Sequence, residues 1–145
     1  MRFQSVEELK DKRILVVGLG RTGVALAHFL SKHQAQVTIT DHKSRPELAS
    51  RLEGVENLPI KFELGSHSPK TFLQQDIVIL SPGVPPHLKI FEYARSQGVK
   101  ITGEFEFAMQ FITEPVVAVT GTNGKTSVAR LAEEFLKASG VKVWV

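Results

Sequence analysis

Short apolar runs alternate with longer segments of helical spacing along most of the chain. Runs rich in valine, isoleucine and leucine, bounded by glycine, aspartate or polar turns, are typical of buried strands in a parallel sheet. Five such runs occupy residues 13–18, 36–41, 60–65, 76–83 and 99–103. Segments with apolar residues every three or four positions predict helices at 22–34, 46–54, 87–98 and 104–112. This alternation predicts an α/β fold with a Rossmann-like, doubly wound parallel sheet.

Three further local signals concern the ends and connections of these elements. Ser5 followed three residues later by Glu8 is a capping-box pattern and predicts a short helix over residues 5–12. Gly54 is expected to end the helix that starts at Pro46. Residues 66–75 are interpreted as a connection between the third and fourth strands.

The alternating pattern starts again after the Thr-Glu-Pro sequence at residues 113–115. The apolar residues 116–119 predict a strand, 126–140 a helix, and 141–145 another strand. We therefore expect two domains, 1–113 and 114–145, the second being the first β-loop-α-β unit of a P-loop ATPase domain. So short a unit cannot cover both faces of its strands, so it should pack on the first domain, fray, or exchange strands with a second copy in a homodimer. Exchange is the ordered outcome that we expect.

A glycine-rich loop follows the first predicted strand. Gly18, Gly20 and Gly23 have G-x-G-x-x-G spacing, which permits a tight turn, backbone approach to a diphosphate and close packing of helix on strand. Asp41 ends the second predicted strand, where a carboxylate can accept from a ribose hydroxyl. NAD or another nucleoside diphosphate is the expected ligand, and the alternative is a glycine turn that binds nothing.

The segment Ser81–Pro86 follows the fourth predicted strand and contains three prolines and a glycine. It is interpreted as a rigid loop, either a stiff connection or a wall of the same pocket, because open α/β sheets bind ligands at the carboxyl ends of their strands.

A second glycine-rich loop, Gly121–Thr126, has the sequence G-T-N-G-K-T. It departs from the common G-x-x-x-x-G-K-[ST] pattern, because Val119 stands where that pattern has its first glycine. Gly121 and Gly124 still let the backbone turn its N–H groups towards phosphate oxygens. Lys125 is expected to reach the β- and γ-phosphates of ATP, and Thr126 to bind Mg²⁺. Two different nucleotide loops in one chain fit neither a simple dehydrogenase nor an ordinary ATPase.

Composition narrows the class of protein. Hydrophobic residues make up 42% of the 145 residues and charged residues 23%, which argues against disorder and fibres. The absence of cysteine excludes disulfides and thiolate metal sites. With no signal-peptide pattern and no apolar run near the roughly 20 residues that a membrane span needs, we expect a cytoplasmic protein that does not bind membranes. The net charge is only +3, and the lysines and arginines are scattered along the chain, so nucleic acid is not expected as a partner.

The sequence VVAVTGTNGKTS at residues 116–127 resembles the phosphate loop of the Mur ligases, the ATP-dependent amide-forming enzymes of peptidoglycan precursor synthesis. Residues 14–41, 76–86 and 98–108 resemble the branch of that family that adds D-glutamate to UDP-N-acetylmuramoyl-L-alanine. The resemblance covers the whole chain, and the chain is expected to correspond to about the first third of such an enzyme. The alternatives are the L-alanine-adding branch and an NAD-binding regulatory module.

The resemblance implies a role for each residue of the two loops. The uridine nucleotide is expected to contact Gly18, Gly20, Arg21, Thr22, Gly23, Asp41, His42, Lys43, Ser81, Pro82 and Gly83. ATP is expected to contact Gly121, Thr122, Asn123, Gly124, Lys125, Thr126 and Ser127, with Lys125 catalytic and Thr126 the Mg²⁺ ligand. His42 and Lys43 depart from the Asp-Thr-Arg or Asp-Asp-Arg that the family often has after the second strand.

The reaction implied by the resemblance is ligation through an acyl phosphate. The carboxylate of UDP-N-acetylmuramoyl-L-alanine attacks the γ-phosphate of ATP, and the amine of D-glutamate then displaces phosphate from the acyl group. No general base for the amine is evident among the 145 residues, and the chain is expected to be inactive alone.

Overall fold

The computed structural model describes residues 3–145, which form two compact units, the first reaching to Ile112 and the second spanning Thr113–Val145. The first unit contains a five-stranded sheet in the order β3-β2-β1-β4-β5, with every neighbouring pair parallel. The strands are β1 (Arg13–Val17), β2 (Gln36–Asp41), β3 (Ile60–Leu64), β4 (Ile77–Leu80) and β5 (Lys100–Gly103). The predicted parallel, doubly wound α/β sheet is confirmed.

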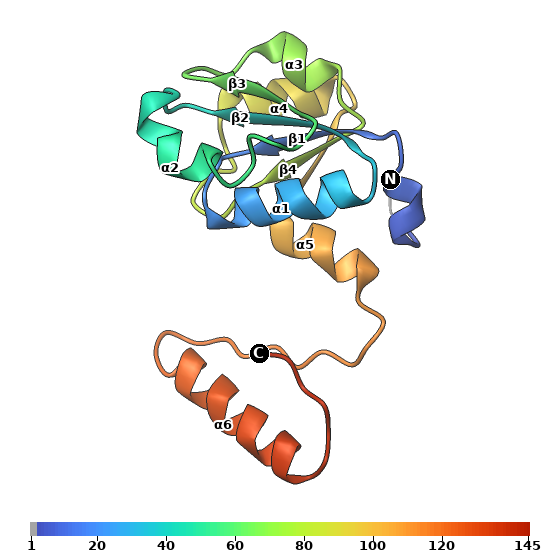
Figure 1. Cartoon of the computed structure of the whole chain (residues 1–145), viewed down its shortest axis with the longest axis vertical. Helices are drawn as coiled ribbons and strands as arrows, with labels where there is room; N and C mark the ends of the chain where they lie inside the picture. The colour runs from blue at the N-terminus through green and yellow to red at the C-terminus, as the bar shows by residue number, and fades with distance from the viewer. Residues whose placement is uncertain (1–2) are drawn as a thin grey trace. The chain divides into compact units, whose positions relative to one another are not determined.

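Helices cover both faces of this sheet (Figure 1). The buried residues of α1 (Arg21–Lys32), η2 (Pro46–Leu48), α2 (Ala49–Leu52) and α5 (Glu104–Ala108) pack on one face, together with the 3₁₀-helix η1 (Val6–Leu9). Those of α3 (Pro69–Leu73) and α4 (Lys89–Ser96) pack on the other. A short 3₁₀-helix, η3 (Met109–Phe111), follows α5.

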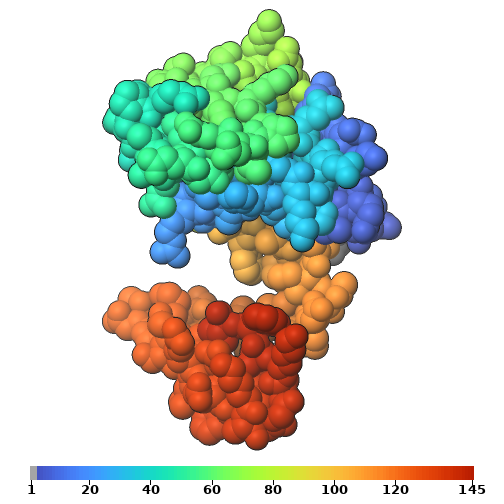
Figure 2. Space-filling view, viewed as in Figure 1, coloured from blue at the N-terminus to red at the C-terminus, as the bar shows by residue number. Residues whose placement is uncertain are grey.

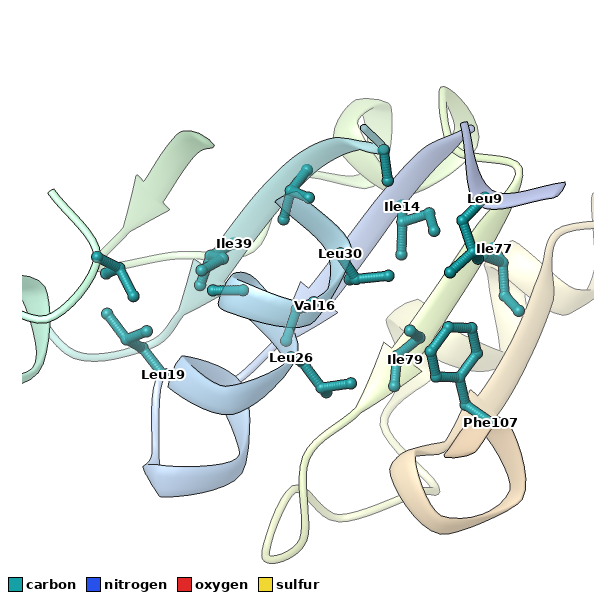
Figure 3. Packing of buried hydrophobic residues seen from close by; sticks show 14 of the residues in the cluster. Leu9, Ile14, Val16, Leu19, Leu26, Leu30, Ile39, Ile77, Ile79 and Phe107 are labelled. Carbon is teal, nitrogen blue, oxygen red and sulfur yellow. The ribbon is translucent and has the colours of Figure 1, made fainter. Parts of the chain in front are cut away.

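Strand alternation divides the apolar residues between two cores. Ile14 and Val16 of β1 point into the α1 side, whereas Leu15 and Val17 point into the α3–α4 side. β1 lies in the middle of the sheet, so both its faces are buried and its apolar run is nearly continuous. In Figure 3, Leu26 and Leu30 of α1 lie over the side chains of the central strands.

Three local predictions differ from the structure. Ser5 makes no side-chain capping bond, and the first helix is only the four-residue 3₁₀-helix η1. α2 ends at Leu52 with Glu53 as its C-cap residue, so Gly54 follows the cap but lacks the left-handed conformation of a capping glycine. The expected connection 66–75 contains the short helix α3, which starts at a proline and places Phe72 in the core. The proline in its first turn favours a helix start, and the turn brings Phe72 into the core.

The second unit, coloured orange to red in Figure 2, contains the helix α6 (Lys125–Ala138). The expected helix is present, but the expected strands at 116–119 and 141–145 are wrong, because neither segment forms a strand among the described residues. A strand needs a neighbour to take its N–H and C=O groups, and no sheet of the described chain includes these segments.

One ion pair joins the beginnings of the central strands. The guanidinium Nη2 of Arg13 donates to Asp76 Oδ1 (2.7 Å), and the Arg13 N–H donates to Asp76 Oδ2 (2.9 Å). In return the Asp76 N–H donates to the Arg13 carbonyl (2.8 Å). The hydrogen bonds from the Arg13 side chain and N–H to the Asp76 carboxyl, with the positive charge of Arg13, lower its pKa below the ordinary 3.8.

Asp76→Asn should lower the thermal unfolding midpoint at pH 7 by roughly 3 °C, since a partly exposed pair contributes modestly. Because the folded pKa of Asp76 is depressed, its stabilisation is complete above pH 3.8 and is lost as the pH falls through the lower folded value. The difference between the two proteins should therefore shrink on acidification below that pH. Thermal unfolding of both, followed by circular dichroism from pH 7 downwards, checks this.

Glu56→Gln is the matched control. Glu56 pairs with Arg45 at 3.3 Å, but both side chains are more than half exposed, so its midpoint should equal that of the parent chain. If the midpoint of Asp76→Asn at pH 7 also equals the parent's, the Arg13–Asp76 ion pair does not stabilise the fold.

Candidate nucleotide site at the carboxyl ends of the strands

The order in which the chain adds strands reverses between the parallel neighbours β1 and β4, and this is where the glycine loop lies. β1 leads through its loop and α1 to β2 on one side, whereas β4 leads through α4 to β5 on the other. Open α/β sheets bind ligands in the crevice that such a reversal creates. The loops 18–20, 41–43 and 81–83 follow β1, β2 and β4, so the predicted residues lie at one edge of the sheet.

Gly18 and Gly23 are required by the backbone. Gly18 has a φ of +97°, and a Cβ there would lie 3.2 Å from side-chain carbons of Ser81 and Val84. A Cβ on Gly23 would lie 2.1 Å from the Gly18 carbonyl oxygen. The third glycine of the motif therefore lets α1 pack directly against the end of β1.

Gly20 differs from these two glycines. A Cβ there would meet no atom within 4 Å, so the fold does not need a glycine at this position. It is the N-cap residue of the 12-residue helix α1, and no side chain of the described chain caps that helix. The first N–H groups of α1 are thus left to another acceptor, next to open space, which is the arrangement that favours an anion. Arg21 is exposed and Thr22 half-buried beside it.

Asp41 ties two of the loops together. Its Oδ2 accepts from the Leu19 N–H (2.8 Å) and its Oδ1 from the Lys43 N–H (2.9 Å). The residue is 7% exposed, so its carboxylate acts in this structure first as a link between the loops after β1 and β2. Contact with a ribose stays a prediction. The side chains of His42 and Lys43 are exposed, and His42 Nδ1 lies 3.3 Å from Asp41 Oδ1.

Ser81 joins the third loop to the first. Its hydroxyl donates to the Gly18 carbonyl (3.0 Å), and its N–H donates to the Val17 carbonyl (3.0 Å). The Val84 N–H donates back to the Ser81 carbonyl (3.2 Å), which closes a turn with Gly83 at a φ of +87°. Ser81 is buried, whereas Pro82 and Gly83 are exposed. Ser81 thus positions the glycine loop. Pro82 and Gly83 form an exposed segment that follows Ser81 in the chain.

Sequence reasoning missed Thr40 and His67. Thr40 is fully buried at the end of β2, and its carbonyl accepts from the Gly18 N–H (2.8 Å). His67 follows β3, and its Nδ1 lies 2.8 Å from Thr40 Oγ1. The position of His67 after a strand, between two serines, was the available signal, but strand order was needed to bring it to Thr40.

The second glycine loop, in the second unit, begins α6. Gly121 and Gly124 have φ values of +149° and +79°, and Gly124 is the N-cap residue. The Lys125 ammonium donates to the carbonyls of Gly121 (2.5 Å) and Thr122 (3.4 Å), so it lies across its own loop. Thr126 and Ser127 are exposed on the first turn of α6. The loop therefore places a cation and uncapped helix N–H groups together, which fits a phosphate.

A Mg²⁺ ion at this loop would depend on few protein ligands. Among residues 3–145, no group of three or more His, Cys, Asp or Glu residues could hold a metal ion. The Thr126 hydroxyl is consistent with the expected site, because Mg²⁺ bound with a nucleotide takes most of its ligands from phosphate and water.

No helix of the described residues is long and apolar enough to cross a membrane.

Comparison with known proteins identifies the family. The family model "Mur ligase MurD-like, N-terminal domain" matches residues 12–103. A UDP-N-acetylmuramoylalanine–D-glutamate ligase of Bdellovibrio bacteriovorus is 69% identical over 143 residues, 99% of this chain and 31% of the relative. One from Geobacter sp. strain M21 is 49% identical over 138 residues, 95% of this chain and 30% of the relative. The chain thus spans about a third of the length of these curated relatives.

A solved structure supports the same relationship. A pseudomurein peptide ligase type C from Methanothermus fervidus is 26% identical, with a TM-score of 0.55 over 89% of this chain and 26% of that one. The family match does not favour the alternative of an NAD-binding regulatory module. With five parallel strands, a glycine loop at their reversal point and a family match over residues 12–103, the chain belongs to the MurD-like branch of the Mur ligases and contains its N-terminal domain.

Proposed function

We propose that the chain is the nucleotide-recognising part of a cytoplasmic ligase that adds D-glutamate to UDP-N-acetylmuramoyl-L-alanine, and that its first unit binds the UDP portion of that substrate. The observation that carries the proposal is the uncapped N-terminus of α1 beside the open space at Gly20. The high identity to ligases whose names contain this substrate supports the choice of UDP over NAD.

Some residues of the first unit bind the nucleotide, and others hold the binding loops in place. The diphosphate is bound by the N–H groups of Gly20, Arg21 and Thr22, helped by the positive end of α1. Asp41 and Ser81 keep the loops in place through the Leu19 N–H and the Gly18 carbonyl. His42, Lys43, Pro82 and Gly83 are exposed at the same edge, where the uracil and ribose would lie.

The glycine loop of the second unit is proposed to bind ATP. Lys125 leaves its contacts with the carbonyls of Gly121 and Thr122 and turns to the β- and γ-phosphates, for which its charge is needed. Gly121, Asn123, Gly124 and Ser127 shape the loop and donate to phosphate oxygens. Mg²⁺, held by Thr126, would offset negative charge on the transferred phosphoryl group.

The chain alone is proposed to lack ligase activity. The relatives are about three times as long, and ligation needs all substrates held together. ATP consumption by the purified chain is therefore expected to be independent of D-glutamate and of UDP-N-acetylmuramoyl-L-alanine. Phosphate release that requires both of these substrates would contradict the proposal.

Gly20→Val should abolish binding of UDP without lowering the thermal midpoint. A Cβ at this position meets no atom within 4 Å in the folded chain, but the side chain occupies the place where the backbone approaches the diphosphate. Isothermal titration of the parent and the variant with UDP, and with NAD for comparison, measures this. The parent is expected to bind UDP and not NAD.

Gly23→Ala is the contrasting variant. Its Cβ would lie 2.1 Å from the Gly18 carbonyl oxygen, so the free energy of unfolding should fall by about 3 kcal/mol or more. Equal UDP affinity for Gly20→Val and the parent would place the diphosphate elsewhere. A stable Gly23→Ala would show that α1 does not need this close contact.

We also propose that two copies of this chain associate through the second unit. α6 has no buried residue, and Leu131, Phe135 and Trp144 are 58%, 66% and 84% exposed. The apolar segments 116–119 and 141–145 belong to no sheet of the described chain. Pairing of these segments between two copies, as the sequence predicts, would satisfy their backbone groups and cover the apolar side of α6.

Phe135→Glu should shift the chain from dimer to monomer, because it places a charge on this apolar side. Multi-angle light scattering across a concentration series measures the change, and Glu134→Gln, at an exposed neighbouring position, should leave the dimer intact. A parent chain that stays monomeric at every concentration would exclude this association.

A further inference from the structure

The loop after β3 is fastened to the end of β2. The Gly65 N–H donates to the carbonyls of Asp41 and Lys43, each at 2.9 Å. Gly65 has a φ of +90°, which turns the chain sharply at that point. Residues Ser66–Ser68 therefore lie beside the loop that follows β2, although none of them belongs to the predicted nucleotide site.

His67 makes the side-chain contact in this loop. Its Nδ1 lies 2.8 Å from the Thr40 hydroxyl, which is also 3.3 Å from the Ser66 carbonyl. The ring meets Phe72 of α3 edge-on, with centroids 6.3 Å apart. Because the Thr40 side chain is fully buried, its hydroxyl depends on these two partners from the β3 loop.

Thr40 in turn reaches the diphosphate loop. Its carbonyl accepts from the Gly18 N–H (2.8 Å), and the next residue, Asp41, accepts from the Leu19 N–H (2.8 Å). Hydrogen bonds on either side of the Thr40 residue therefore link His67, through the end of β2, to the loop that leads into α1.

We propose that His67 is a positioning residue of the nucleotide site, which through Thr40 holds the end of β2 and the Gly18–Gly20 loop in the geometry that binds the diphosphate. The inference rests on the proposed binding of UDP and adds a residue that touches no ligand.

The protonation state of His67 gives this role a distinctive signature. Burial lowers the pKa of His67 below its ordinary 6.5, with Asp41 and Glu63 opposing that shift and His42 adding to it. Asp41 ends β2, His42 follows it, and Glu63 lies in β3. Because burial disfavours the charged ring, protonation weakens its place between Thr40 and Phe72. Nucleotide affinity should therefore decrease as the pH is lowered through this depressed pKa. The decrease should be steeper in the parent chain than in a variant without the imidazole.

Titration of the 145-residue chain with UDP tests the proposal. His67→Ala should weaken UDP binding about three- to tenfold, the worth of one neutral hydrogen bond. His67→Asn should restore most of the affinity, because its amide can reach Thr40 from the same position as Nδ1, and it should remove the extra pH dependence. Thr40→Val, which keeps the shape and loses the hydroxyl, should match His67→Ala. The double variant should be no weaker than either single one.

Three results would overturn the proposal. The first is additive loss in the double variant, and the second is parent-like affinity for His67→Ala at an unchanged thermal midpoint. The third is restoration by His67→Gln and not by His67→Asn, since the longer amide reproduces the far ring nitrogen and would place His67 on the ligand itself. If the parent chain does not bind UDP at all, the proposed function fails, and this inference fails with it.

Discussion

The backbone contact between Gly18 and Gly23 sets how closely α1 approaches β1, and the first unit is arranged around it. Any side chain on Gly23 would overlap the Gly18 carbonyl oxygen. β1 is the central strand of the sheet, so the position of α1 on it determines how Leu26 and Leu30 meet the strand residues in the core (Figure 3). The same contact brings the first N–H groups of α1 to the reversal point of the sheet. Core packing and anion binding therefore depend on one close approach of two glycines.

Hydrogen bonds between the loops then hold this edge of the sheet. Asp41 binds the Leu19 N–H, Ser81 binds the Gly18 carbonyl, and Thr40 binds the Gly18 N–H. The loops carry exposed residues for a ligand, whereas the residues that join them are buried. A site built in this way is largely formed before the ligand arrives, which reduces the entropy lost on binding. It also explains why buried polar residues are concentrated here: Thr40, Asp41 and Ser81 each have a partner in a neighbouring loop.

In the second unit, local interactions replace the contacts between distant loops that shape the first. Its loop and α6 form from local interactions alone: Gly124 adopts the left-handed conformation that begins the helix, and Lys125 satisfies nearby carbonyls. Helices satisfy their own backbone groups, but strands do not. The apolar segments on either side of α6 consequently remain without strand partners in the described chain, and Trp144 is exposed.

The sequence by itself determined the five strands, the long helices and the two glycine loops, because apolar periodicity and glycine spacing are local signals. It also placed Gly18, Asp41 and Ser81 at the ends of strands, and family resemblance pointed to the Mur ligases. Only the tertiary structure decided that Asp41 and Ser81 hold loops together, that Gly20 is free of packing while Gly23 is not, and that His67 reaches Thr40. These outcomes depend on strand order and on distances between residues remote in sequence, such as the 63 positions that separate Gly18 from Ser81. Local patterns carry no information on which strands become neighbours, and this is why the sequence located the site without revealing what holds it in shape.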